Sequence, residues 1–199
     1  MDKSRFEAFS DGVFAFAITL LILGIALGPF REVPTEAQLA HRLLSLWPNL
    51  LAYFLSFAVI GIMWQNHHAL FRLVNRIDRQ TIFLNLALLC VTVFIPFATS
   101  TLGSFASLRP AALLYGLTLT AASTAYNLLL MHLVHSRAFA ENVSGQTIRQ
   151  TMIAYRVGWA TYAAAMLVAL VFPILSIALY LLVVAYYLVP RGADTDITE

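Results

Sequence analysis

Long apolar stretches constrain the fold of this chain more than any motif does. Four of them occupy residues 6–27, 47–71, 81–102 and 110–134. A bilayer core about 30 Å thick is crossed by roughly 20 apolar residues in a helix. The whole chain is 60% hydrophobic and only 11% charged, with a mean hydropathy of +0.80. We therefore expect an all-α membrane protein rather than a water-soluble domain.

A further apolar region, from Val157 to Val189, contains no charged residue. It is too long for one ordinary span, and Pro173 near its middle can end one helix and begin another. We expect spans at about residues 151–172 and 173–189, which makes six in total. A re-entrant pair in this region is the alternative, and it keeps both termini on one side. Residues 1–191 then form one membrane domain, and residues 192–199 form a short acidic tail.

Basic residues are distributed unequally between the two sides of such a bundle. Six spans place nine of the twelve on one side: Lys3, Arg5, Arg72, Arg76, Arg79, Arg137, Arg149, Arg156 and Arg191. Only Arg31, Arg42 and Arg109 fall on the other side. The positive-inside rule then predicts that both termini are cytoplasmic. With a net charge of only +2, juxtamembrane basic residues indicate contact with anionic lipid and no role with nucleic acid.

Several polar residues lie inside the predicted spans, where burial is costly and usually functional. Asp11 follows Arg5 by six residues, which corresponds to about 9 Å of helix. His67 and Asn85 lie at a similar distance from the basic residues that flank their spans, so all three share one depth. With them we group Ser10, Trp64 and His68. The simplest interpretation is a cluster that joins three helices by hydrogen bonds. A proton relay from Asp11 to His67 or His68 is the alternative.

Helical periodicity places a row of side chains on one face of the first span. The row consists of Gly12, Phe16, Thr19, Leu20, Leu23 and Leu27, and Ser10 and Asp11 point away from it. An apolar row of this kind usually packs in a core or against lipid. The hydroxyl of Thr19 favours a different use, because it can contact a hydrated ion.

A family resemblance becomes visible at the start of the chain. Residues 5–11 combine Arg5, Phe9, Ser10 and Asp11, and residues 12–15 continue the pattern. Further matching residues are the run from Trp64 to His68, then residues 70–72, Asp78, Asn85, Pro96 and Phe97. In these segments, which cover roughly the first half of the chain, the sequence resembles the transmembrane protein 175 family of potassium channels in its short prokaryotic form.

The resemblance implies a six-helix subunit in a bacterial inner membrane that assembles with itself as a homotetramer. The first helix of each copy would line a central pore for potassium ions, without the usual potassium filter. Pore-lining or gating positions would be Phe16, Thr19, Leu20 and Leu23. Arg5, Phe9, Ser10 and Asp11 would support the pore helix, with Trp64, His67, His68 and Asn85 as partners. Family members usually have isoleucine or leucine where this chain has Phe16, whose ring face can attract cations.

Two other functions compete with a potassium channel. A proton leak channel or proton-coupled carrier would use Asp11 with His67 or His68. A membrane-embedded metalloenzyme would use His67, His68, His132 and His135. The sequence contains no phosphate-binding loop, nucleophile elbow or zinc-protease helix, so we expect neither an enzyme nor a bound metal or cofactor. Cys90 lies inside the third span, where we expect a small buried residue.

Overall fold

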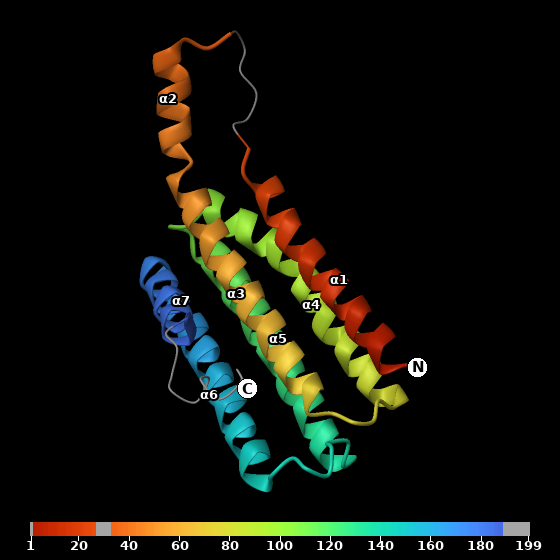
Figure 1. Cartoon of the computed structure of the whole chain (residues 1–199). Coiled ribbons are helices and arrows are strands. Elements are labelled where there is room, and N and C mark those ends of the chain that lie inside the picture. Colours follow the sequence, from red (N-terminus) through yellow and green to blue (C-terminus); the bar gives the residue numbers. More distant parts are fainter. Residues whose placement is uncertain (1, 27–32, 189–199) are drawn as a thin grey trace.

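The structure is a computed structural model that describes residues 2–26 and 33–188, apart from the side chains of residues 186 and 188. Figure 1 shows its helices in chain order. They are α1 (Lys3–Leu20), α2 (Glu36–Ser45), α3 (Trp47–Arg72), α4 (Arg79–Ser104), α5 (Arg109–His135), α6 (Gly145–Ala169) and α7 (Pro173–Leu188), with the 3-10 turn η1 (Leu21–Gly24) after α1. In the described residues the one β contact is an isolated bridge between Val74 and Phe139. The all-α prediction is therefore confirmed.

Five described segments are long and apolar enough to cross a membrane: Lys3–Gly24, Trp47–Arg72, Arg79–Ser104, Arg109–His135 and Gly145–Ala169. The sixth predicted span corresponds to α7, a shorter helix whose apolar part is Pro173–Ala185. Six spans therefore remain a prediction. Helix α6 begins at Gly145 rather than near residue 151, because Ser144 caps it by accepting a hydrogen bond from the Thr147 backbone N–H.

The long helices lie side by side, with α5 at the centre (Figure 1). Helix α5 packs most extensively against α4 and α6, while α1 packs against α3 and α4. Helix α7 contacts α3, α5 and α6. The amphipathic helix α2 extends beyond the upper end of the bundle in Figure 1, and its N-terminus is closed by a capping box of Thr35 and Gln38.

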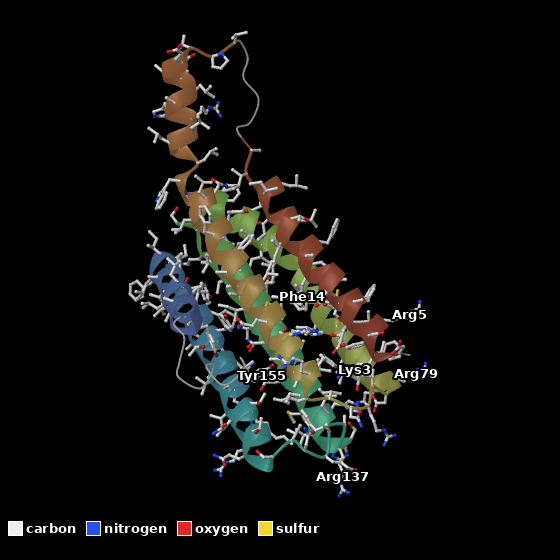
Figure 2. The ribbon with its side chains drawn as sticks, viewed as in Figure 1. Lys3, Arg5, Phe14, Arg79, Arg137 and Tyr155 are labelled. Atoms are coloured by element: carbon white, nitrogen blue, oxygen red, sulfur yellow. The ribbon has the colours of Figure 1, made fainter. Side chains whose placement is uncertain are left out.

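The lower end of the bundle in Figure 1 joins segments that are distant in sequence. The Lys3 ammonium donates a hydrogen bond to the Val74 carbonyl over 2.7 Å. The loop after α3 pairs with the loop after α5, since the Asn75 N–H lies 2.8 Å from the Ala138 carbonyl oxygen. Figure 2 shows Lys3, Arg5, Arg79 and Arg137 toward this end. These four basic residues, all assigned to one side, therefore lie toward one end of the molecule.

Some predictions concern residues outside the described part of the chain. They are Leu27 of the apolar row, the basic residues Arg31 and Arg191, and the acidic tail 192–199. The prediction that Cys90 is buried is wrong, because its side chain is exposed. Cys90 lies on the outward face of α4 together with Phe83 and Phe94, which are also exposed. A bundle surrounded by lipid tolerates apolar side chains on its outer surface, so an apolar residue inside a span need not be buried.

Candidate functional site

Helix α1 has two faces with opposite environments. One face is buried within the subunit through Phe6, Ser10, Phe14 and Ala17, and Leu21 of η1 continues it. The spacing of these positions by three or four residues places them on one side of the helix. Figure 2 labels Phe14, which is buried on this side.

The opposite face of α1 is uncovered in the subunit. Phe16 is 61% exposed and Leu23 is 73% exposed. Gly12 and Thr19 are exposed on the same side of the helix, and Leu20 lies at the edge as a half-buried residue. A Cβ atom added at Gly12 would meet no atom within 4 Å. The predicted row Gly12, Phe16, Thr19, Leu20 and Leu23 thus forms a face that the subunit leaves free. We call Gly12, Phe16, Thr19 and Leu23 the open face of α1.

A buried hydrogen-bond chain fixes the other face of α1 to α3 and α4. The Asn85 amide Nδ2 donates to Ser10 Oγ over 2.9 Å, and Asn85 Oδ1 lies 2.9 Å from His67 Nε2. Because an amide oxygen only accepts, His67 donates from Nε2. Ser10 in turn donates to the Phe6 carbonyl over 3.0 Å. The three side chains are each at most 1% exposed. Their hydrogen bonds therefore satisfy polar groups that would otherwise be costly to bury.

Three phenylalanines surround the imidazole of His67. Its ring centroid lies 4.6 Å from that of Phe71, 5.4 Å from Phe14 and 6.3 Å from Phe6. Phe6 and Phe14 come from the buried face of α1. We call Phe6, Phe14 and Phe71 the aromatic cage of His67, and it connects α1 to α3 independently of the hydrogen bonds. The sequence analysis missed this role of the phenylalanines, since an apolar residue in a span gives no separate signal.

Asp11 lies beside the open face and contacts α3. The indole Nε1 of Trp64 donates to Asp11 Oδ1 over 2.9 Å. The ring of His68 stacks on that indole, with centroids 6.1 Å apart. The predicted polar cluster is therefore divided into a buried chain of Ser10, Asn85 and His67 and an accessible group of Asp11, Trp64 and His68.

Two residues of the predicted supporting motif point outward. Arg5 is exposed and has no hydrogen bond or ion pair with any described residue. Phe9 is 52% exposed. The exposed parts of both side chains are available to groups beyond the subunit.

The histidines of the metalloenzyme alternative have different partners. His67 is held by Asn85, whereas His132 Nε2 lies 3.0 Å from both carboxylate oxygens of Asp78. No group of three or more histidine, cysteine or acidic side chains that can hold a metal occurs among the described residues. The arrangement does not provide the three or four ligands that a zinc site requires.

A second buried polar group lies nearer the upper end of the bundle. Thr99 Oγ1 lies 2.7 Å from Ser56 Oγ, and Ser56 Oγ lies 3.0 Å from the Tyr115 hydroxyl. These residues join α3, α4 and α5, and all are buried. The sequence analysis did not identify this group. A signal was present, because each hydroxyl lies inside an apolar span.

Together these features define a multi-pass helical membrane protein whose first helix is anchored on one face and open on the other. Residues 5–96 match the family model of the endosomal/lysosomal potassium channel TMEM175. A potassium channel from Streptomyces collinus is 39% identical over 191 residues, which cover 94% of this chain and 91% of that protein. The chain belongs to the TMEM175 family, as the resemblance predicted.

Two further comparisons bear on the fold and on the permeant ion. The crystal structure of a lysosomal potassium-selective channel TMEM175 homolog from Chamaesiphon minutus matches with a TM-score of 0.83 and 35% identity, covering 93% of this chain and 95% of that chain. The endosomal/lysosomal proton channel TMEM175 of Gallus gallus is 40% identical over 111 residues, which are 53% of this chain but only 22% of that protein. Relatives are thus named for potassium or for protons.

Proposed function

We propose that this protein is a potassium-permeable cation channel of modest selectivity whose pore forms between four copies of the chain. The observation that carries the proposal is the open face of α1, where Gly12, Phe16, Thr19 and Leu23 are exposed in their own subunit. Four such faces around a shared axis would enclose the pore. The channel would reside in a bacterial inner membrane with both termini cytoplasmic, and it is not an enzyme.

The packing of the subunit favours a path between copies over one within a copy. Its interior holds large, fully buried side chains such as Phe14, Ile60, Leu88 and Tyr115. The buried polar residues Ser10, Asn85 and His67 bond to one another and do not face an open channel. An ion in such an interior would lose its water without gaining ligands. Water can accompany an ion along the open face, because that face is exposed.

Phe16 is the proposed gate. Four phenylalanine rings at one level would form a hydrophobic constriction that closes by excluding water. The same rings attract cations through their faces, so rotation of the side chains would leave a passage that tolerates a cation. Thr19 lies one turn further along and donates its hydroxyl hydrogen to the Phe16 carbonyl over 2.8 Å. Its oxygen lone pairs then face the pore, followed by Leu20 and Leu23.

Anchoring of the opposite face gives this gate a fixed orientation. Rotation of α1 by one residue, about 100°, would remove Ser10 from Asn85 and separate Phe6 and Phe14 from His67. The buried hydrogen bonds and the aromatic cage oppose that rotation. Supporting residues therefore act on conduction through the position of Phe16, without touching the ion.

Flux measurements on the purified full chain in liposomes test the proposal. Opposed potassium and proton gradients are applied, and the reversal potential is recorded. We expect it to follow the potassium gradient, with a smaller response when sodium replaces potassium. A reversal potential that follows only the proton gradient would exclude potassium conduction.

Proton conduction is the second candidate, favoured by two observations. Asp11 is partly accessible beside the open face, and the vertebrate relative is named a proton channel. However, the group between Asp11 and His68 is an indole, whose N–H only donates and cannot pass a proton on. Protons would instead follow water along the open face. Proton flux that survives Asp11→Asn would agree with that path and exclude a relay through Asp11.

A further inference from the structure

Helices α5 and α6 form a groove on the outside of the bundle, away from the open face of α1. The groove is lined by Thr124, Asn127, Leu128, Arg156 and Trp159. Leu128 and Trp159 are 49% and 43% exposed, and Arg156 is exposed as well. The groove combines one cation, one aromatic ring and aliphatic surface. It has no role in the proposed conduction path.

The Arg156 guanidinium has no counter-charge in its surroundings. No hydrogen bond or ion pair joins it to any of the residues that the structure describes. Neither α5 nor α6 contains an aspartate or a glutamate. Asp78, the acid that contacts α5, is engaged by His132 at the end of that helix. The positive charge of Arg156 is therefore available to an external anion.

The position of Arg156 along α6 indicates that its charge lies within the apolar part of the helix. Residues 145–150 at the start of α6 are mostly polar, and Arg156 lies six residues beyond Gln150, or about 9 Å along the helix. Asn127 precedes the last residue of α5 by eight residues, or about 12 Å. An arginine at that depth must extend toward the polar headgroups or meet an anion. Arg149 lies seven residues earlier on the same face of α6, nearer the lower end. The two arginines mark a path from the lower interface into the groove.

Other groove residues are held in fixed orientations. Trp159 Nε1 donates to Thr124 Oγ1 over 2.9 Å, which fixes the indole across the two helices. The Asn127 amide donates to the carbonyls of Ser123 and Tyr155 over 2.9 and 3.1 Å. Because those bonds use the Nδ2 hydrogens, the Oδ1 atom remains as an acceptor. The groove therefore offers a donor fork at Arg156 and an acceptor at Asn127.

We propose that the α5–α6 groove binds one anionic phospholipid from the leaflet at the lower end of the bundle. Its phosphate pairs with the Arg156 guanidinium, whose planar fork matches two phosphate oxygens. A headgroup hydroxyl donates to Asn127 Oδ1, and the acyl chains lie along Leu128 and the Trp159 ring. Basic pockets between transmembrane helices commonly receive anionic headgroups in this way. The proposal requires that the chain spans a membrane, but not that it selects potassium.

Binding of phosphatidylglycerol to the purified full chain in detergent provides the test, with phosphatidylcholine as the uncharged reference. Bound lipid is counted by native mass spectrometry across a lipid titration. We expect phosphatidylglycerol to be preferred and Arg156→Gln to weaken its binding about fivefold. Arg156→Lys should retain part of the preference, because it keeps the charge but loses the fork. Arg109→Gln, at the far end of α5, should leave it unchanged.

Several results would overturn the proposal. Equal binding of the two lipids, or equal binding of phosphatidylglycerol by the natural chain and Arg156→Gln, would show that Arg156 does not bind an anionic lipid. Displacement of the lipid by excess inorganic phosphate would make it a soluble-anion site. Altered subunit stoichiometry in Arg156→Gln, with lipid binding unchanged, would assign Arg156 to a contact between copies. If Arg156→Gln does not fold, phosphatidylglycerol binding is compared between Leu128→Glu and its neutral match Leu128→Gln. Binding should be weaker in Leu128→Glu, because only the carboxylate repels the phosphate, and equal binding would contradict the proposal.

Discussion

Trp64 Nε1 on α3 lies 2.9 Å from Asp11 Oδ1 on α1 and donates a hydrogen bond to it at the edge of the open face of α1. The bond joins a charged acceptor to a rigid ring that also stacks on His68. On the buried side of α1, Ser10 is held by Asn85. Adjacent residues of one helix are thus bound to two different neighbours, which defines the rotation of α1 about its own axis.

Asp11→Ala should lower thermal stability and weaken assembly of the subunits, because the indole N–H loses its acceptor. Asp11→Asn should retain most of both, since the amide oxygen can still accept that hydrogen bond. Unfolding temperature and oligomer mass of the two variants, measured in detergent, check this expectation. Equal losses in both variants would show that the charge, rather than the hydrogen bond, is needed.

Asn85→Ala should be among the more destabilising single substitutions in α4. It leaves the His67 N–H unpaired in a buried site and removes the donor to Ser10 Oγ, at a cost of about 1–3 kcal/mol in the free energy of unfolding. Thr92→Val is the matched control, since the Thr92 hydroxyl bonds only to the Leu88 carbonyl of its own helix. Denaturant titrations of both variants provide the measurement, and a loss no larger than that of Thr92→Val would contradict the proposed anchoring.

Helical periodicity and depth along the spans predicted much of the arrangement of residues on the first helix. The 100° step of a helix grouped Gly12, Phe16, Thr19 and Leu23, and these residues do share an exposed face. Distance from basic flanking residues put Asp11, His67 and Asn85 at one depth, and His67 and Asn85 are joined by a hydrogen bond in the structure. Both arguments work because they use only local helix geometry. The function of the face is not fixed by that geometry and remains a proposal.

Other features depend on packing that a single sequence does not contain. The cage around His67 requires the relative rotation of α1 and α3, and periodicity within one helix says nothing about that angle. The separation of His68 from the buried chain has the same origin. Helix α6 begins before the predicted span for a different reason, since residues 145–150 are mostly polar and extend the helix beyond its apolar part. Ser144 followed by Thr147 was the available capping signal.

Tyr180→Phe should leave stability unchanged or raise it slightly. The Tyr180 hydroxyl is buried and has no hydrogen-bond partner in the described structure, so its removal relieves a desolvated polar group, worth about 1 kcal/mol. Gly116→Ala should be destabilising, because its new Cβ would meet the Tyr180 hydroxyl and lie 2.9 Å from Met166 Cβ. In the double variant part of that loss should be recovered. Unfolding free energies that simply add would argue against the contact.

Asp78 should make stability depend on pH in acid. Its carboxylate accepts hydrogen bonds from the Thr81 backbone N–H and hydroxyl over 2.7 and 2.8 Å, and the backbone bond is the main reason that its pKa falls from 3.8 to about 2. A lowered pKa in the folded state stabilises the protein above about pH 4. That contribution fades as the pH falls from about 4 to about 2.

Because the Asp78 side chain is 50% exposed, the effect should be small, about 1 kcal/mol or less. Asp78→Asn keeps a capping side chain but removes the titration. The difference in unfolding temperature between the natural chain and Asp78→Asn should therefore shrink between about pH 4 and pH 2. A difference that is constant over this range would show that the charge of Asp78 does not contribute.

Phe16 and Phe14 provide a matched pair on one helix, since Phe16 is 61% exposed and Phe14 only 1%. Phe16→Ala removes the ring from the open face, so we expect higher ion flux in liposomes with little change in stability. Phe14→Ala removes a ring packed against His67, and a buried phenylalanine replaced by alanine costs about 3–5 kcal/mol. Flux per folded protein and unfolding temperature separate the two effects. Unchanged flux in Phe16→Ala, with the protein folded and assembled, would place the gate elsewhere along α1.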